Sequence, residues 1–327
     1  MNRREFLEAT LALMVAPSAF AASTPAPQDI PRRKLGRTGE QVSCIGLGGA
    51  HIGGQKDEAE SIRIIRGALD RGITFMDNCW DYHEGQSEVR MGKALQEGYR
   101  AKAFLMTKID GRDKKTAAAQ IDESLRRLRT DHLDLLQLHE IIHENDPQRS
   151  FGPGGALEAM QEAQKAGKAR FLGFTGHKSP AMHLAMLEAG QKHGVRFDAV
   201  QMPLNVLDAH YDSFEKRVLP VLVREEIGVL GMKPLGGAFI LKSKTVSAVD
   251  CLRYALSLPV SVTITGMDSM ARLEQALKVA RGFQPLSEKQ IQALLAKTEK
   301  VAQDGALEKY KSSTHFDGTT QHPEWLG

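Results

Sequence analysis

The sequence has 327 residues, of which 42% are hydrophobic and 25% are charged, and its formal net charge is +3. This composition is ordinary for a soluble globular protein, and the length suffices for one large domain with a deep core. The positive charge is not gathered into a stripe of lysine and arginine interleaved with aromatic residues. We therefore expect no nucleic-acid partner.

The first 22 residues predict an export signal rather than part of the fold. Arg3 and Arg4 precede a short apolar stretch (11–15) and an A-x-A cleavage sequence (19–21). This order is similar to a twin-arginine signal, which predicts the twin-arginine export machinery as a partner and a periplasmic location. The alternative is a basic amphipathic N-terminus on a cytoplasmic protein. The apolar stretch is too short for a stable membrane span.

Residues 23–31 are rich in proline and alanine and predict a linker to a domain that covers residues 32–327. The three cysteines, Cys44, Cys79 and Cys251, are too few and odd in number for a disulfide framework. We expect Cys44 and Cys79 to be buried free thiols, because they fall in apolar strand-like runs. No spacing of cysteine and histidine indicates zinc, so we expect no metal site.

From residue 44 onward, apolar strand-like runs alternate with segments of helical period. The runs lie at 44–49, 73–77, 103–108, 133–139, 170–176, 198–202, 228–233 and 260–265. The helical segments lie at 58–70, 87–95, 115–128, 155–166, 180–192, 211–224, 246–258 and 269–281. Such alternation predicts a parallel sheet, and eight units over roughly 250 residues predict a (β/α)₈ TIM barrel. An extra C-terminal helix (287–302) and a tail follow the barrel.

A doubly wound sheet is the alternative α/β fold. It would be favoured by a G-x-G-x-x-G sequence between a strand and a helix. The nearest match, Gly46-Leu47-Gly48-Gly49, lacks the third glycine.

Four chemically complementary residues lie at the ends of three neighbouring predicted strands: Asp77, Tyr82, Lys108 and His139. The active site of a TIM barrel lies at these strand ends, so the four can converge. Taken singly, each has a structural explanation: a helix cap, a packed ring, a solvated lysine and a core histidine.

Together the four residues favour proton transfer to a substrate oxygen. A phenol has a pKa of about 10, and a nearby ammonium lowers that value. The carboxylate would keep the ammonium charged, and the histidine would orient the substrate oxygen. We expect a lowered pKa for Tyr82; two units correspond to roughly 2.7 kcal/mol. The group could then protonate a developing alkoxide, or deprotonate an alcohol in reverse.

Over residues 33–282 the sequence resembles the aldo-keto reductase family. The resemblance rests on KLGRTGEQVSCIGLGG (34–49), FMDNCWDYHEGQSEVRMGKAL (75–95), FLMTK (104–108), SLRRLRTDHLDLLQLH (124–139) and GKARFLGFTG (167–176). It implies a barrel that binds an extended nicotinamide dinucleotide and passes hydride to a carbonyl carbon without a metal. Tyr82 would be the proton donor, and Asp77, Lys108 and His139 would complete a tetrad. The partner would be a small aldehyde or ketone, with a keto-sugar as one candidate.

The resemblance also implies a set of cofactor-binding residues: Gly49, Thr175, Gly176, Gln201, Met232, Lys233, Leu235, Gly266, Asp268, Arg272 and Gln275. Thr175-Gly176 replaces a common Ser-Asn pair, and Gln201 matches a carboxamide-binding glutamine. Met232 stands where a tyrosine commonly stacks under the nicotinamide, and Lys233 could reach the pyrophosphate.

The adenosine end of the cofactor decides between the two dinucleotides. Gly266 replaces a lysine that contacts the 2′-phosphate, whereas Arg272 matches a residue that grips this phosphate or stacks on adenine. Asp268 could instead accept a hydrogen bond from a free ribose hydroxyl. NADP(H) is therefore favoured, and NAD(H) stays open.

His51, Trp80, the loop at 140–153 and the tail at 315–325 are expected to line the substrate pocket. Trp80 would form an apolar or sugar-stacking wall, the alternative being a scaffold tryptophan. Two other functions stay open. The substitutions at the cofactor positions fit a non-catalytic dinucleotide-binding protein, and Lys108 or Lys233 could form a Schiff base in a lyase.

Overall fold

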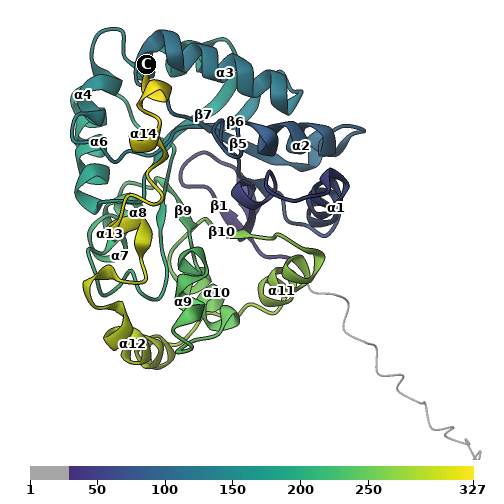
Figure 1. Ribbon diagram of the computed structural model, residues 1–327, viewed down its shortest axis with the longest axis vertical. Coiled ribbons are helices and arrows are strands. Elements are labelled where there is room, and N and C mark those ends of the chain that lie inside the picture. The colour runs from purple at the N-terminus through teal and green to yellow at the C-terminus, as the bar shows by residue number, and fades with distance from the viewer. Residues whose placement is uncertain (1–28) are drawn as a thin grey trace, which may run out of the picture.

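Eight parallel strands close into a barrel in the computed structural model, which describes residues 29–327 (Figure 1). The strands follow one another around the barrel in chain order, and the last pairs with the first. They are β3 (Ile45–Gly48), β4 (Phe75–Met76), β5 (Phe104–Ile109), β6 (Leu133–Leu138), β7 (Ala169–Thr175), β8 (Ala199–Pro203), β9 (Gly228–Met232) and β10 (Val262–Gly266). The predicted TIM barrel is confirmed. The predicted signal (1–22) and most of the predicted linker (23–31) lie outside the described residues.

The barrel interior is filled by side chains and closed at its N-terminal end by a hairpin. The rings of Phe75, Phe104 and Phe171 stack inside it, with centroids 5.3 and 6.4 Å apart. Strands β1 (Arg32–Lys34) and β2 (Gln41–Ser43) pair antiparallel, and Leu35 and Val42 pack against this interior cluster. The bottom of the barrel is therefore sealed, and access is restricted to the other end.

Helices surround the barrel because each has an apolar face that packs against the strands. They are α1 (Glu58–Leu69), α2 (Gln86–Ala94), α3 (Lys114–Leu128), α4 (Asp146–Phe151), α5 (Ala156–Lys165), α6 (Pro180–Lys192), α7 (Phe214–Arg217), α8 (Leu219–Arg224), α9 (Phe239–Lys242), α10 (Ala248–Ser257) and α11 (Met270–Arg281). The predicted helix at 211–224 is two short helices, α7 and α8. Pro220 lies in the first turn of α8, and a proline cannot donate the backbone hydrogen bond that would continue α7.

The extra C-terminal helix is α12 (Glu288–Ala302), and the chain then returns over the C-terminal ends of the strands. This tail includes α13 (Lys309–Ser312) and α14 (Gly318–Gln321) and is drawn in yellow in Figure 1. The Arg112 amide donates to the Leu326 carbonyl (2.9 Å), and the Gln120 side chain donates to the Trp325 carbonyl (3.0 Å). The last residues of the chain are therefore tied to the β5–α3 loop and to α3.

Cys44, Cys79 and Cys251 are buried and unpaired. Within residues 29–327, none of the helices has the length and apolar character needed to cross a membrane.

Candidate active site

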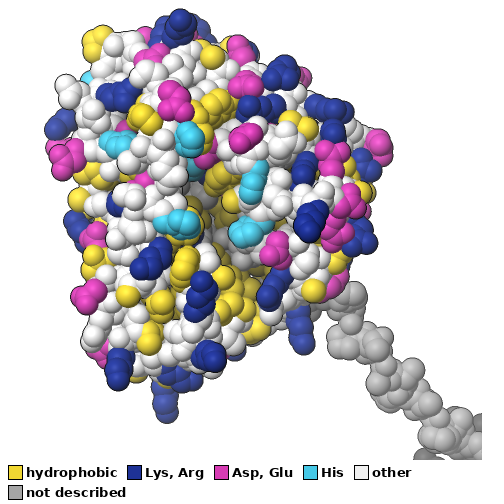
Figure 2. All heavy atoms as spheres, viewed as in Figure 1, with side chains coloured by type: hydrophobic (Ala, Val, Ile, Leu, Met, Phe, Trp, Pro, Cys, Tyr) yellow, Lys and Arg dark blue, Asp and Glu magenta, His cyan; other side chains and the backbone are white. Residues whose placement is uncertain are grey.

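A cavity of about 830 Å³ opens at the C-terminal ends of the barrel strands. Figure 2 shows it as a hollow in the middle of this face, with histidine side chains around it. Its walls include residues from each of the eight strands or the loop that follows it, and from the tail, among them His315, Phe316, Gly318 and Gln321. Asp77, Tyr82, Lys108 and His139 all line this cavity, so the structure brings the four predicted residues together.

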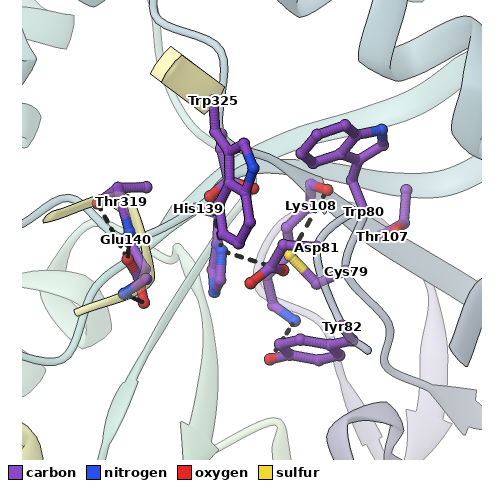
Figure 3. A network of polar contacts seen from close by, with 12 residues as sticks. Cys79, Trp80, Asp81, Tyr82, Thr107, Lys108, His139, Glu140, Thr319 and Trp325 are labelled. Carbon is purple, nitrogen blue, oxygen red and sulfur yellow. Dashed lines mark hydrogen bonds and ion pairs between the residues drawn. The ribbon is translucent and has the colours of Figure 1, made fainter. Parts of the chain in front are cut away.

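The Lys108 ammonium joins two other members of this group, Tyr82 and Asp77, and Figure 3 shows its contact with Tyr82. It donates to the Tyr82 hydroxyl (3.2 Å) and to the Asn78 carbonyl (2.6 Å), and it pairs with Asp77 Oδ1 at 2.7 Å. Lys108 has three N–H groups, and these three contacts can account for all of them. The lysine is thus held in one position, and its charge is directed at the phenol oxygen.

The electrostatics favour a charged lysine beside a neutral phenol. Burial lowers the pKa of Lys108, but the Asp77 carboxylate together with Cys79 and Asp81 outweighs it, so the net pKa is raised. Burial also raises the pKa of Tyr82 well above its ordinary value, and the charge of Asp77 adds to this increase. The expectation of a lowered Tyr82 pKa is therefore wrong for the protein without ligand. The charge of Lys108 favours the phenolate, but burial and the Asp77 carboxylate have the larger effect on the pKa of Tyr82 and raise it.

His139 lies beside two carboxylates that the sequence analysis did not assign. Its Nδ1 hydrogen-bonds Asp110 Oδ1 (2.9 Å) and lies 3.6 Å from Asp81 Oδ1. Burial lowers the pKa of His139, but Asp81 and Asp110 outweigh it and the net pKa is raised. Burial raises the pKa of Asp81 to about 6. Because Nδ1 faces these carboxylates, Nε2 is the ring nitrogen left to contact a substrate oxygen.

The same histidine belongs to a group that could hold a metal ion. Cys79, Asp81, Asp110 and His139 each offer one ligand atom, and these atoms lie within 4.8 Å of one another. The spacing of these residues along the chain did not indicate this group. In the structure the His139–Asp110 hydrogen bond uses two of the four members.

The loop that carries Tyr82 is fixed by residues of the sequence GQSE (85–88). The Ser87 hydroxyl donates to the Gly49 carbonyl (2.7 Å), and Arg127 donates to the Trp80 carbonyl (2.8 Å). The Arg127 guanidinium packs directly over Gly85, so that a β-carbon at this position would lie 2.3 Å from it. Gly85 also has a φ of 82°, a backbone conformation that favours glycine. These contacts hold the phenol against the barrel wall.

Two buried polar atoms on the cavity wall fit the carboxamide of a nicotinamide. Among residues 29–327, no group lies within hydrogen-bond distance of Thr175 Oγ1 or Gln201 Oε1, although both are buried. Buried polar groups without a partner are rare, so these atoms are suited to bind a ligand. Both residues line the cavity, as does Gly176, and a β-carbon on Gly176 would lie 2.6 Å from the Ile141 carbonyl oxygen.

The other predicted cofactor residues divide into two sets. Those that line the cavity are Met232, Lys233, Leu235, Gly266, Asp268, Arg272 and Gln275. Gly49 is not part of the wall; its amide faces Asp77 Oδ2 at 3.4 Å. His51 does line the cavity, and its ring occupies the space beside Gly266, where a β-carbon would lie 2.6 Å from it.

Trp80 does not lie where the sequence analysis expected it. It is absent from the cavity wall, and its indole N–H donates to Glu123 on α3 (2.8 Å). Its ring meets the edge of Trp325 at a centroid distance of 5.9 Å (Figure 3). Trp325 is also absent from the cavity wall, and Glu140 is the only residue of the 140–153 loop that lines it. The two tryptophans therefore join the tail to the barrel instead of facing a substrate.

Some of the residues missed by the sequence analysis had a signal in the sequence. Asp110 follows Lys108 by two positions at the end of one strand, and such residues point to the same side. Asp81 directly precedes Tyr82. Phe316 and Gln321, by contrast, belong to the tail segment 315–325 that the sequence analysis expected at the pocket, and both line the cavity.

Comparisons with known proteins agree with this geometry. A family model described as "Aldo/keto reductase family" matches residues 44–249. The aldo-keto reductase AMT2 of Alternaria alternata is 26% identical over 301 residues, which is 78% of each chain. The aldo-keto reductase YhdN of Bacillus subtilis is 34% identical over 196 residues, covering 55% of this chain and 54% of its own. L-galactose dehydrogenase of Arabidopsis thaliana is 26% identical over 345 residues, covering 90% and 99%.

Among solved structures, the aldo-keto reductase AKR11C1 from Bacillus halodurans, in its holo form, superposes with a TM-score of 0.69. It is 21% identical and covers 82% of this chain and 96% of its own, so it supports the fold. The family match spans more than half of the chain. It includes the four residues predicted to form the tetrad: Asp77, Tyr82, Lys108 and His139. The chain belongs to the aldo/keto reductase family.

Proposed function

We propose that the protein is an NAD(P)H-dependent oxidoreductase that reduces an aldehyde or ketone to the alcohol, with Tyr82 as proton donor. The observation that carries this proposal is the contact between the Tyr82 hydroxyl and the Lys108 ammonium on the cavity wall. Family membership supports the oxidoreductase class and a nicotinamide cofactor.

Thr175 and Gln201 would hold the carboxamide of the dinucleotide, because their free oxygens are buried in the cavity wall. The reduced nicotinamide, when bound, supplies hydride to the carbonyl carbon. The protein supplies the proton: the Tyr82 O–H bond breaks and a new O–H bond forms on the substrate oxygen. His139 would hold that oxygen through Nε2, and the phenolate left on Tyr82 would be stabilised by Lys108.

The raised pKa of Tyr82 is compatible with this role. A phenol with a high pKa keeps its proton at neutral pH and gives it up only to a stronger base. A developing alkoxide is such a base. The charge of Lys108 then stabilises the phenolate that forms in the transition state, which is where stabilisation accelerates a reaction.

The alternatives have less support. Lys108 already makes three close contacts, which leaves no free amine for a Schiff base. Lys233 has no such partners among residues 29–327, and borohydride trapping of a carbonyl adduct would reveal Schiff-base chemistry on it. A non-catalytic barrel would bind the dinucleotide without turnover. The keto-sugar suggestion loses its basis in Trp80, which does not line the cavity.

We also propose a preference for NADP(H) and export through the twin-arginine route. Arg272 lines the cavity on α11, and its guanidinium lies 3.3 Å from the Gln275 side chain, so two polar groups are available to a phosphate. Export rests on the sequence of residues 1–22 alone. Because that route carries folded proteins, the barrel could take up its dinucleotide before export.

Tyr82 should not lose its proton at a lower pH than an ordinary tyrosine. Burial and the Asp77 charge raise its pKa, so it should stay protonated between pH values of about 8 and 10.5, where ordinary tyrosines ionise. The protein and its Tyr82→Phe variant should therefore show the same rise in tyrosinate absorbance over this range. A smaller rise in the variant would show that Tyr82 ionises early.

Replacement of Tyr82 by phenylalanine should lower kcat/KM for an aldehyde by about 10²- to 10⁴-fold, because the proton donor is lost. NADPH oxidation followed by absorbance measures this rate, and calorimetry should show that NADPH still binds. Tyr99→Phe is the matched control, since the Tyr99 hydroxyl contacts Asp70 on the outer surface. Equal rates for both variants would remove Tyr82 from the chemistry, and binding without turnover in the unchanged protein would favour the non-catalytic alternative.

The Arg272→Ala variant should bind NADPH about tenfold more weakly, because a charged hydrogen bond to the 2′-phosphate is lost. NADH lacks this phosphate, so its affinity should change much less. Calorimetry with both dinucleotides gives the comparison, and Arg126→Ala on the exposed side of α3 is the control. Equal losses for the two dinucleotides would contradict a phosphate-binding role.

Double replacement of Arg3 and Arg4 by lysine should abolish export if the first residues act as a twin-arginine signal. Cell fractionation of the full chain and of this variant would measure the periplasmic share. A cytoplasmic location of both forms would refute export.

A further inference from the structure

Lys233 is a cavity residue that the proposed chemistry does not use. It directly follows strand β9 and takes a φ of 53°, a backbone conformation uncommon for residues other than glycine. Its Nζ lies 4.7 Å from the ring centroid of Phe316 and 5.5 Å from that of Tyr310. Both rings belong to the C-terminal tail. The ammonium is therefore held on the side of the cavity that the tail covers.

Within the part of the chain that the structure describes, the ammonium of Lys233 has no anionic partner. Across residues 29–327, no carboxylate oxygen lies within the 4.0 Å of an ion pair with its Nζ. The neighbouring acids are already engaged. Asp77 pairs with Lys108, and the Glu140 carboxylate accepts from the amides of Gly318 (3.1 Å) and Thr319 (2.8 Å). Burial lowers the pKa of Lys233 to about 8, although the more distant charges of Glu140 and Asp77 act in the opposite direction.

The tail supplies an apolar frame around this charge. Phe316 lines the cavity next to Lys233, and His315 and Gln321 add polar groups from the same segment. A lysine can pack its aliphatic stem against aromatic rings while its ammonium still donates hydrogen bonds to an anion. The surroundings thus combine a free cation with an apolar wall at the substrate side of the cavity.

We propose that Lys233 binds a carboxylate of the substrate, and that the preferred substrates are oxo acids: carbonyl compounds that carry a carboxylate. This inference rests on the proposed carbonyl reduction and adds the substrate class. It reassigns Lys233, which the sequence analysis expected to reach the cofactor pyrophosphate. The basis for the reassignment is that Lys233 packs against the tail, which is the segment expected at the substrate pocket.

The test compares two substrates of nearly the same shape, para-carboxybenzaldehyde and its methyl ester. The acid should be reduced with a higher kcat/KM than the ester. In the Lys233→Met variant the ratio of the two kcat/KM values should fall about ten- to hundredfold, because a hydrogen-bonded ion pair with the carboxylate is lost. Lys233→Arg keeps the charge and should retain part of the preference.

A binding measurement separates this inference from the proposed function. Calorimetry on the protein loaded with NADP⁺ should show that benzoate binds more tightly than benzamide, and that Lys233→Met removes the difference. This result would stand even if neither aldehyde were reduced, in which case the proposed function fails and the carboxylate site remains. Lys233→Gln serves as a second neutral variant, and thermal melting checks that each variant is folded.

Three outcomes would overturn the proposal. The acid and the ester could be reduced equally well by the unchanged protein. The ratio could stay the same in Lys233→Met and Lys233→Gln. Finally, both variants could weaken NADPH binding and slow both substrates to the same extent, which would assign Lys233 to the cofactor.

Discussion

The site depends on one buried ion pair, between Lys108 and Asp77. Lys108 is 0% exposed, and an ammonium buried without a partner would cost several kcal/mol. The pairing of Phe75 with Phe104 and of Met76 with Leu105 places the end of β4 beside β5, so that Asp77 can reach Lys108. A slip of one residue between these strands would turn Lys108 to the opposite face. The register of the barrel and the chemistry of Tyr82 are therefore fixed by the same contact.

The tail is the second constraint, because it completes the cavity through buried polar contacts. Glu140 accepts hydrogen bonds from the amides of Gly318 and Thr319, and Asp317 contacts both His177 (3.1 Å) and Lys178 (2.6 Å). Removal of the tail would leave these buried groups without partners, which costs more than the contacts contribute. We infer that the tail stays docked on the barrel and sets the shape of the substrate side.

The barrel and the four catalytic candidates could be predicted because their signals are local. Apolar strands have a recognisable length, and the residues that follow Phe75–Met76 and Leu133–Leu138 must lie at one end of a parallel barrel. The position of Trp80 and the direction of the Tyr82 pKa could not be predicted in this way. Both depend on neighbours distant in the chain: Trp80 contacts Glu123 and Trp325, and the pKa of Tyr82 depends on how completely its surroundings exclude water.

Lys108 and Lys233 show how a partner determines what a lysine can do. Both lie at strand ends on the same cavity, and burial lowers the pKa of each. The Asp77 carboxylate, with Cys79 and Asp81, more than offsets this for Lys108, whose net pKa is raised. Lys233 has no such partner in the described part of the chain, and burial lowers its pKa to about 8. A bound carboxylate would raise that pKa, so binding above this pH would be accompanied by uptake of a proton from solution onto Lys233. The charge of Lys108 is thus part of the scaffold, whereas that of Lys233 is coupled to the ligand.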